Sequence, residues 1–225
     1  MLLYDLAGAD DRRFSPYCWR VKMALAHKGL PFETVATGFT QIAAIGDGSH
    51  RTVPVLIDGE RQIHESFVIA EYLEDLFADR PSLFGGAGGR AAARLIDGYA
   101  TSLLVQIGRM VTLDIEAILR PEDRGYFRAT REKRFGKPLE EVVAGREDRL
   151  AGFRESLLPL RLMLRHQPFV GGAGANYADH ILFGTLQWPR VVSSFRLIAE
   201  DDPVAAWFER CLDLYDGLGR SQAAA

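Results

Sequence analysis

The residues that could carry chemistry begin with Ser15-Pro16-Tyr17-Cys18, close to the N-terminus. Serine is a favoured helix N-cap and proline suits the first helical position, so this tetrapeptide predicts a helix start. The unpaired N–H groups and the dipole of a helix N-terminus favour a bound anion, such as a thiolate. A serine hydroxyl can accept a capping N–H and still donate to an external sulfur. Taken alone, the motif is explained equally simply by a plain N-cap.

Two further motifs are suited to binding a peptide. Thr52-Val53-Pro54-Val55 stands at the start of an apolar strand, where proline removes a donor of the β-ladder. A cis Val53-Pro54 bond would turn the preceding backbone outward, so an extended ligand could pair with Val53. Glu65-Ser66 offers a carboxylate that accepts from an ammonium, and a hydroxyl and N–H that donate to a carboxylate. An edge-strand proline and a capped helix are the simpler structural explanations of these two motifs.

The elements that must position these residues follow from periodicity. Residues 1–80 alternate short β-type and helical segments, which predicts a mixed four-stranded sheet covered by helices. Strands are expected at 2–6, 32–37, 53–57 and 61–64, and the last two form a hairpin around Asp58-Gly59. One helix should run from Ser15 to Gly29, buried on more than one side, and a second should start with Ser66 as its N-cap.

The second half of the chain has only helical periodicity. Segment 81–89 contains two Gly-Gly pairs and lacks periodicity, so it is expected to be a linker between a domain at 1–80 and an all-α domain at 90–225. Long helical segments are expected within 90–119, 146–165 and 178–198. Asn176 followed by Asp179 predicts a capping box, with Asp179 structural and not catalytic.

Composition excludes several classes of function. The net charge is -3, the pI is near 6.0 and no run of like charges occurs, so no nucleic-acid partner is expected. Asp5 arrives too early for a signal peptide, and no stretch has the roughly 18 apolar residues of a membrane span, so we expect a cytoplasmic protein without a membrane partner. The two cysteines, Cys18 and Cys211, cannot form a disulfide framework or a four-ligand zinc cluster. We expect both to be reduced, and no metal to be bound.

The order of the three motifs within this framework closely resembles the glutathione transferase superfamily, over essentially the whole chain. The resemblance implies a thioredoxin-like first domain and a helical second domain that forms a hydrophobic pocket. It implies glutathione as co-substrate, with Ser15 stabilising its thiolate, Val53-Pro54 pairing with its cysteinyl unit, and Glu65-Ser66 binding its γ-glutamyl group. A homodimer and a small hydrophobic or aromatic electrophile are implied as further partners.

The group that binds the glycine carboxylate of glutathione is left open among Arg51, His50 and Gln41. Arg51 is our choice, because a guanidinium suits bidentate binding of a carboxylate. The electrophile pocket is expected within residues 95–135.

Within the superfamily, the chain is similar to bacterial glutathione-dependent β-aryl etherases. The similar stretches are 15–17 with Trp19-Arg20, 24–25 with 27–29, 38–40, 68–73, 144–150 and 216–220. The resemblance therefore implies a glutathione transferase that attacks an apolar aromatic electrophile, with reductive β-aryl ether cleavage as a more specific expectation.

Cys18 leaves a different reaction open. It stands three residues after Ser15, so the pair resembles a Cys-x-x-Cys redox motif whose leading cysteine is replaced by serine. We interpret Cys18 as a core residue of a buried helix. The alternatives are a thiol-disulfide or dehydroascorbate-type reductase that works through Cys18, and a non-catalytic protein that binds glutathione or hydrophobic ligands.

Overall fold

A four-stranded mixed sheet organises residues 1–80 of the computed structural model, which describes residues 1–225. The strands are β1 (Leu2–Leu6), β2 (Glu33–Thr37), β3 (Val55–Asp58) and β4 (Arg61–His64), in the order β2-β1-β3-β4. β1 and β2 are parallel, whereas β3 is antiparallel to both β1 and β4. The expected sheet and hairpin are confirmed. β3 begins two residues later than expected, since Pro54 has no N–H to donate and the ladder starts with Val55 opposite Tyr4.

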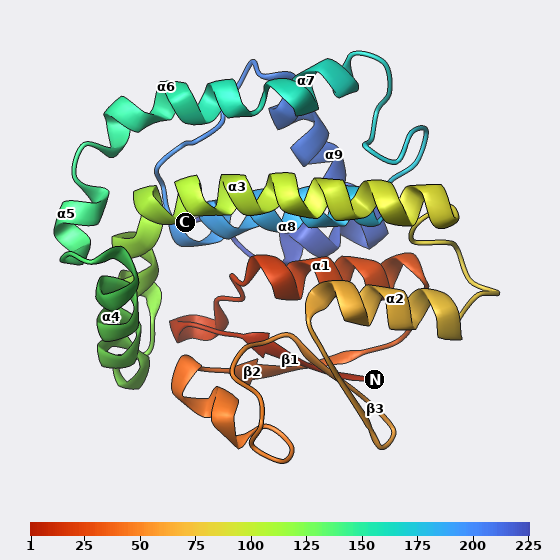
Figure 1. The fold of residues 1–225 in the computed structure, drawn as a ribbon, viewed down its shortest axis with the longest axis horizontal. Helices are drawn as coiled ribbons and strands as arrows, with labels where there is room; N and C mark the ends of the chain where they lie inside the picture. The colour runs from red at the N-terminus through yellow and green to blue at the C-terminus, as the bar shows by residue number, and fades with distance from the viewer.

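Two helices of this half, α1 (Pro16–His27) and α2 (Ser66–Leu76), lie between the sheet and the helical half (Figure 1). Ser15 is the N-cap of α1, as expected. The prediction that Ser66 caps α2 is wrong: Glu65 occupies the N-cap position, and Ser66 is the first helical residue. Glu65 has φ 69° and makes no side-chain capping bond. Its carboxylate therefore stays available to an external group.

The second half is all-α. Its helices are α3 (Ala87–Ile118), α4 (Pro121–Phe135), α5 (Leu139–Val143), α6 (Arg146–Ser156), α7 (Leu158–Leu164), α8 (Tyr177–Val192) and α9 (Pro203–Gly217). No helix is both long enough and apolar enough to cross a membrane.

Three predicted boundaries in this half were wrong for local reasons. α3 starts at Ala87 and not at Arg90, since Gly89 packs so closely on Phe84 that a Cβ there would lie 1.7 Å from the Phe84 carbonyl oxygen. The segment 146–165 is two helices, because Pro159 lies in the first turn of α7 and cannot continue α6. α8 ends at Val192 and not at residue 198, because Pro189 interrupts the hydrogen bonds of its last turn.

Helix α1 is buried on several sides, as its sequence predicts. Two basic residues, Arg20 within α1 and Lys28 just after its end, are buried as well. Arg20 pairs with Asp97 of α3 at 2.6 Å, and Lys28 pairs with Glu74 of α2 at 2.6 Å. Gly184 lets α8 approach the start of α1, because a Cβ at that position would lie 2.3 Å from the Pro16 carbonyl oxygen. The N-terminus of α1 is thus fixed against the helical half.

A buried histidine cluster lies at the other end of α1. The Tyr215 hydroxyl is hydrogen-bonded to His27 Nδ1 and to His180 Nε2, each at 2.8 Å. Burial lowers the pKa of His27 and lowers that of His180 well below its usual range. Both rings therefore favour the neutral form in the folded protein.

Candidate functional site

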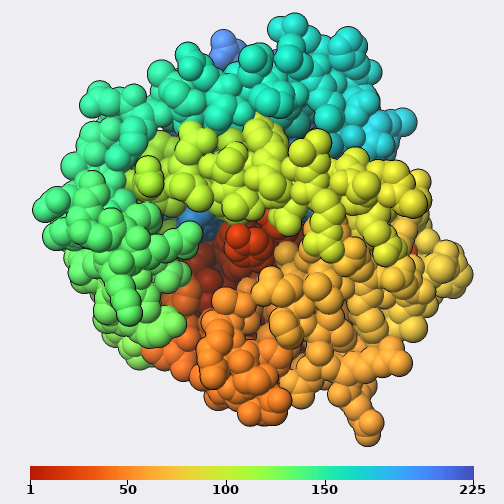
Figure 2. Space-filling view, viewed as in Figure 1, coloured from red at the N-terminus to blue at the C-terminus, as the bar shows by residue number.

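A cavity of about 700 Å³ lies where the two halves of the chain meet. In Figure 2 it appears as a hollow with red N-terminal residues at its floor, bounded by yellow-green α3, green α4 and the orange segment around residues 40–54. Its lining includes the predicted residues Ser15, Arg51, Val53, Pro54, Glu65 and Ser66. Residues from separate segments of the first half are thereby brought together against one wall of helices.

Ser15 is placed at the floor by its role as N-cap. Its backbone is extended, and its Oγ accepts a hydrogen bond from the Cys18 N–H at 3.3 Å. The residue is 4% exposed and lines the cavity, and this capping bond is the one hydrogen bond that its side chain makes. The hydroxyl proton can therefore be donated into the cavity, beside the N–H groups of the first turn of α1.

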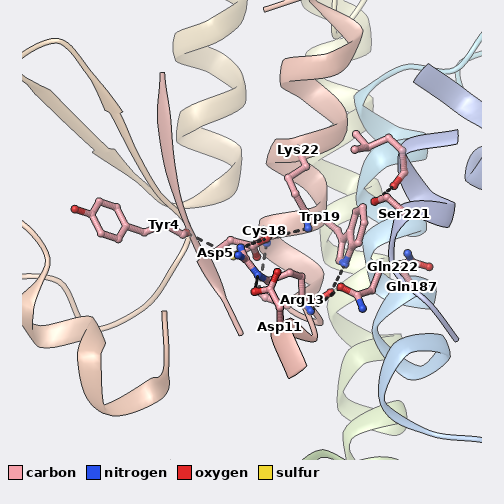
Figure 3. A network of polar contacts seen from close by, with 12 residues as sticks. Tyr4, Asp5, Asp11, Arg13, Cys18, Trp19, Lys22, Gln187, Ser221 and Gln222 are labelled. Atoms are coloured by element: carbon pink, nitrogen blue, oxygen red, sulfur yellow. Dashed lines mark hydrogen bonds and ion pairs between the residues drawn. The ribbon is translucent and has the colours of Figure 1, made fainter. Parts of the chain in front are cut away.

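The loop before Ser15 is held by a network of residues that do not line the cavity (Figure 3). The Arg13 N–H donates to Gln222 Oε1 at 2.9 Å, and the Arg13 carbonyl accepts from Trp19 Nε1 at 2.8 Å. The Arg13 guanidinium reaches the buried Asp5 carboxylate of β1 at 3.4 Å. The position of Ser15 is thus fixed by the sheet, by α1 and by the C-terminal segment together.

Val53 offers an unused backbone to the cavity. The Val53-Pro54 peptide bond is cis, and both residues line the cavity. The N–H and C=O of Val53 take part in no hydrogen bond within the chain. An extended peptide could therefore pair with them in the manner of an added strand.

Glu65 and Ser66 lie together at the start of α2. Glu65 is exposed, whereas Ser66 is 4% exposed and its carbonyl accepts from the Tyr177 hydroxyl at 2.7 Å. The N-terminal N–H groups of α2 and the Ser66 hydroxyl can donate to a carboxylate, and Glu65 can accept from an ammonium. This pair of groups suits the zwitterionic end of an amino acid.

The sequence offered Arg51, His50 and Gln41 as binders of the glycine carboxylate. Of these three residues, only Arg51 lines the cavity. Its guanidinium donates to the Gly48 and His50 carbonyls at 2.9 and 3.0 Å and has no carboxylate partner. The His50 ring is bonded to Gln62 Oε1 at 3.1 Å, and Gln41 Oε1 accepts from the Gly38 N–H at 2.8 Å. Neither of these two side chains lines the cavity.

Cys18 lies outside the cavity. It is fully buried, and its Sγ lies 3.9 Å from the Tyr4 carbonyl of β1, within the network of Figure 3. Burial, and then the nearby Asp5 carboxylate, raise the pKa of the Cys18 thiol. A buried thiol that resists ionisation is a poor nucleophile, so this geometry counts against a reductase that works through Cys18.

Part of the cavity wall is aromatic. Phe39 lies at the centre, with its ring centroid 6.3 Å from Phe14, 6.3 Å from Tyr126 and 5.5 Å from Phe127. Trp188 of α8 also lines the cavity. Residues of α3 and α4 within 95–135 line this cavity, and so do rings from outside that range that sequence reasoning missed, Phe14, Phe39 and Trp188.

Comparison with known proteins identifies the family. Residues 11–81 match the glutathione S-transferase N-terminal domain, and residues 93–214 match the glutathione S-transferase C-terminal domain. The chain belongs to the glutathione S-transferase family. A probable glutathione S-transferase of rice, Oryza sativa subsp. japonica, is 29% identical to this transferase over 219 residues, covering 91% of the chain and 86% of the rice protein.

Solved structures agree with this assignment. A glutathione transferase of Phanerochaete chrysosporium superposes with a TM-score of 0.76 at 28% identity, covering 98% of this transferase and 93% of that chain. A glutathione S-transferase of Ceriporiopsis subvermispora in complex with glutathione superposes with a TM-score of 0.82 at 24% identity, covering 96% of each chain. The thioredoxin-like first half and the helical second half are thereby established for this transferase.

Two buried carboxylates of the transferase stabilise the frame around the cavity. Asp179 completes the predicted capping box of α8, and it also accepts from the N–H groups of Val170 and Gly171 and from Trp207 Nε1 at 2.7 to 2.9 Å. Asp123 of α4 accepts from the Thr40 N–H at 2.8 Å and from its hydroxyl at 2.9 Å. Sequence reasoning found Asp179 through its local capping motif. It missed Asp123, because that contact joins residues 83 positions apart.

Proposed function

We propose that this transferase binds glutathione along the floor of the cavity and activates its thiol at Ser15. The observation that carries the proposal is the convergence of Ser15, Val53, Glu65 and Arg51 on one cavity from separate segments of the chain. Each of these residues presents an unused donor or acceptor there, as described above. Together they match the thiol, the cysteinyl amide, the ammonium and a carboxylate of one tripeptide.

In the proposed binding mode, the cysteinyl N–H and C=O pair with the free backbone of Val53. The γ-glutamyl ammonium lies at Glu65, and its carboxylate is bound by Ser66 and the α2 N-terminus. The glycine carboxylate lies at Arg51, whose guanidinium has no acidic partner within the chain. This arrangement places the sulfur at the N-terminus of α1.

Activation then follows from electrostatics. A free thiol has a pKa of about 8.5 and is only a few per cent ionised at neutral pH. The Ser15 hydroxyl and the first-turn N–H groups of α1 would stabilise the thiolate and lower that pKa. The thiolate attacks an electrophilic carbon, the carbon–sulfur bond forms, and the leaving group departs with the bonding pair.

We propose that residues 1–80 bind glutathione and that the helices of residues 90–225 supply most of the wall for an aromatic electrophile. Family membership supports a homodimer. Both cysteines are unpaired and buried, which is compatible with the reducing cytoplasm.

A more specific candidate reaction is reductive cleavage of a β-aryl ether. The sequence stretches similar to β-aryl etherases and the aromatic wall around Phe39 support it. The thiolate would displace a phenolate from the carbon next to a carbonyl, giving a glutathione thioether and the phenol after protonation. Turnover of halogenated aromatics alone, with none of such ethers, would leave a transferase of other specificity.

The proposal is tested by binding and turnover measured on the same protein. Glutathione should raise the melting temperature, because a ligand at a hundredfold excess over its Kd stabilises the folded state by about 2.7 kcal/mol. The thiol-free analogue γ-glutamyl-aminobutyryl-glycine should bind as well, but should give no thiolate absorbance. Absence of any shift at millimolar glutathione would refute the proposal. Binding without turnover of any electrophile would favour the non-catalytic alternative, and a mixed disulfide on Cys18 would favour the reductase.

A further inference from the structure

The part of the cavity that we assign to the electrophile, lined by α3, α4 and Phe39, carries an excess of positive charge. Arg109 of α3 and Arg131 and Arg134 of α4 line the cavity, and none of the three forms an ion pair within the chain. The acidic residue among the lining residues is Glu65, which the proposed binding mode assigns to the ammonium of glutathione. Arg51 is likewise assigned to a glutathione carboxylate. Three guanidinium groups thus remain without a negative partner.

Arg131 is the most constrained of the three. Its guanidinium lies 4.8 Å from the ring centroid of Phe127 and 5.4 Å from that of Phe39, the ring at the centre of the aromatic wall. Its one hydrogen bond within the chain is to the Thr130 hydroxyl at 3.1 Å. A guanidinium has five N–H donors in a planar fork, so most of them are free to bind a ligand.

The surroundings of Arg131 favour an added anion. Arg131 is only partly exposed. Burial, and then the nearby charge of Arg134, lower the pKa of the Arg131 guanidinium. The other partly exposed arginines of the chain either pair with an acid, as Arg161 does with Asp202, or donate to a backbone carbonyl, as Arg154 does to that of Leu197. Arg131 differs from them because the space beside it is the cavity.

We propose that the electrophile of this transferase is an aromatic molecule that carries a carboxylate or sulfonate, bound by Arg131 with Arg134 and Arg109 nearby. This inference rests on the proposed function, since it assigns the substrate class of the same cavity. The flat rings around Phe39 would hold the aromatic body, and the guanidinium fork would bind the acid group and orient the reactive carbon toward the thiolate. Arg131 is then a specificity-determining residue.

The alternative is that Arg131 only packs on its two rings. A cation–π contact of this kind stabilises the fold but does not distinguish charged from neutral ligands. The two roles therefore differ in one measurable respect, the preference for an anionic substrate over a neutral one of the same shape.

The first experiment compares two electrophiles, a chlorodinitrobenzoate and its primary amide. For each compound, the enzymatic rate is divided by the rate of its uncatalysed reaction with glutathione. In both, the thiolate adds to the carbon that bears chlorine and chloride leaves. We expect kcat/KM to favour the carboxylate by about tenfold or more, as a charge-assisted hydrogen bond allows. Arg131→Gln should abolish this preference, and Arg131→Lys should restore part of it.

Lys133→Gln is the matched control. Lys133 lies on the same helix, is exposed, does not line the cavity and forms no ion pair, so the variant removes the same charge at a different place. It should keep the carboxylate preference of the parent protein. An equal loss in Lys133→Gln and Arg131→Gln, or no preference in the parent, would overturn the proposal.

A binding experiment separates this inference from the proposed chemistry. Anilinonaphthalene sulfonate and the uncharged N-phenylnaphthylamine share one ring system, and their fluorescence reports binding without any reaction. S-hexylglutathione is used to identify the bound probe that it displaces from the cavity. At that site, Arg131→Gln should weaken binding of the sulfonate probe about tenfold and leave the affinity of the uncharged probe unchanged. Equal effects on both probes would refute the anion site even if glutathione conjugation is intact. A selective effect would support it even if the role of Ser15 fails.

Discussion

Replacing Ser15 with alanine tests the centre of the proposed chemistry. The side chain can make two separable contributions: its Oγ caps α1 by accepting from the Cys18 N–H at 3.3 Å, and its hydroxyl, which donates to no group of the chain, can donate to a ligand in the cavity that Ser15 lines. Alanine removes both. The capping loss should lower stability by about 1 kcal/mol, while the loss of the donor should change the ionisation of bound glutathione.

The expected size of the second effect follows from one hydrogen bond to a charged group. Such a bond contributes about 1.5 to 3 kcal/mol, and a pKa unit corresponds to about 1.36 kcal/mol, so the pKa of the bound thiol should rise by about one to two units. Below that pKa, the thiolate population falls by roughly ten- to a hundredfold. The rate constant kcat should fall by about ten- to a thousandfold, the range known for a lost donor to an anion.

The assay is a spectrophotometric titration of the thiolate of bound glutathione, together with kcat as a function of pH, at a temperature well below unfolding of the variant. Ser15→Thr keeps the hydroxyl and should retain most of the activity. Cys18→Ala alters the same helical turn without altering the cavity, and should leave both the titration and kcat nearly unchanged. If Ser15→Ala leaves the titration unmoved while Cys18→Ala abolishes activity, the assignment of the activating residue is wrong.

Three further predictions concern glutathione binding at Glu65, the contribution of Asp179 to stability, and the pH dependence of stability. Glu65→Gln should raise KM for glutathione and leave kcat nearly unchanged, because the contact to the distal ammonium is the same in ground and transition states; equal losses in kcat and kcat/KM would contradict this. Asp179→Ala leaves four donors without their partner, among them the buried Trp207 Nε1, so denaturant unfolding should show a loss of about 3 kcal/mol, against less than 1 kcal/mol expected for exposed Asp148→Ala. Because the folded pKa of His180 lies well below 6.5, the unfolded chain binds its proton first on acidification, so stability is lost as the pH falls below about 6.5. This histidine should therefore lower the stability as the pH falls from about 7.5 to 5.5, and His180→Gln should remove that part of the pH dependence in urea titrations.

The parts of the fold that the sequence predicted are those with local causes. The cap and proline at Ser15-Pro16, the hairpin turn at Asp58-Gly59 and the capping box from Asn176 to Asp179 each rest on hydrogen bonds between near neighbours. Such bonds depend little on the rest of the chain, so residue type and spacing suffice to predict them.

The errors at helix starts arose where close packing or an uncommon backbone conformation outweighed residue type. The start of α3 at Ala87 depends on the close packing of Gly89 against Phe84, which no helix propensity describes. The N-cap position of α2 went to Glu65 because its backbone is left-handed at the exit from β4. Positive φ at a glutamate is uncommon, so residue type alone favoured Ser66.

The aromatic wall around Phe39 was the least predictable part of the candidate site. Arg131 follows the helical pattern of α4, and its sequence neighbours Lys133 and Arg134 give it the appearance of a solvated face. Only the packing of Arg131 over Phe39, which comes from the first half of the chain, reveals that it lines a cavity. The sequence did not single out Trp188 either. Most residues of α8 are buried, so its pattern does not distinguish a ring that lines a cavity from one that packs in the core.

The two sides of the cavity are held by separate networks, and this bears on how specificity can change. Ser15 is fixed by Arg13 and its contacts to β1, α1 and the C-terminal segment. The aromatic wall around Phe39 is held by Asp123, whose carboxylate accepts hydrogen bonds from Thr40 in the space that a side chain at Gly38 would fill. The two networks meet where the Phe14 ring packs on Phe39 and where Arg120 donates to the Gly8 carbonyl and to Gln41 Oε1, so substitutions in α4 that keep these contacts should alter the aromatic wall without moving Ser15. A change at Gly38, by contrast, should displace Phe39 and α4 together, because a Cβ there would lie 2.3 Å from the Asp123 carboxylate.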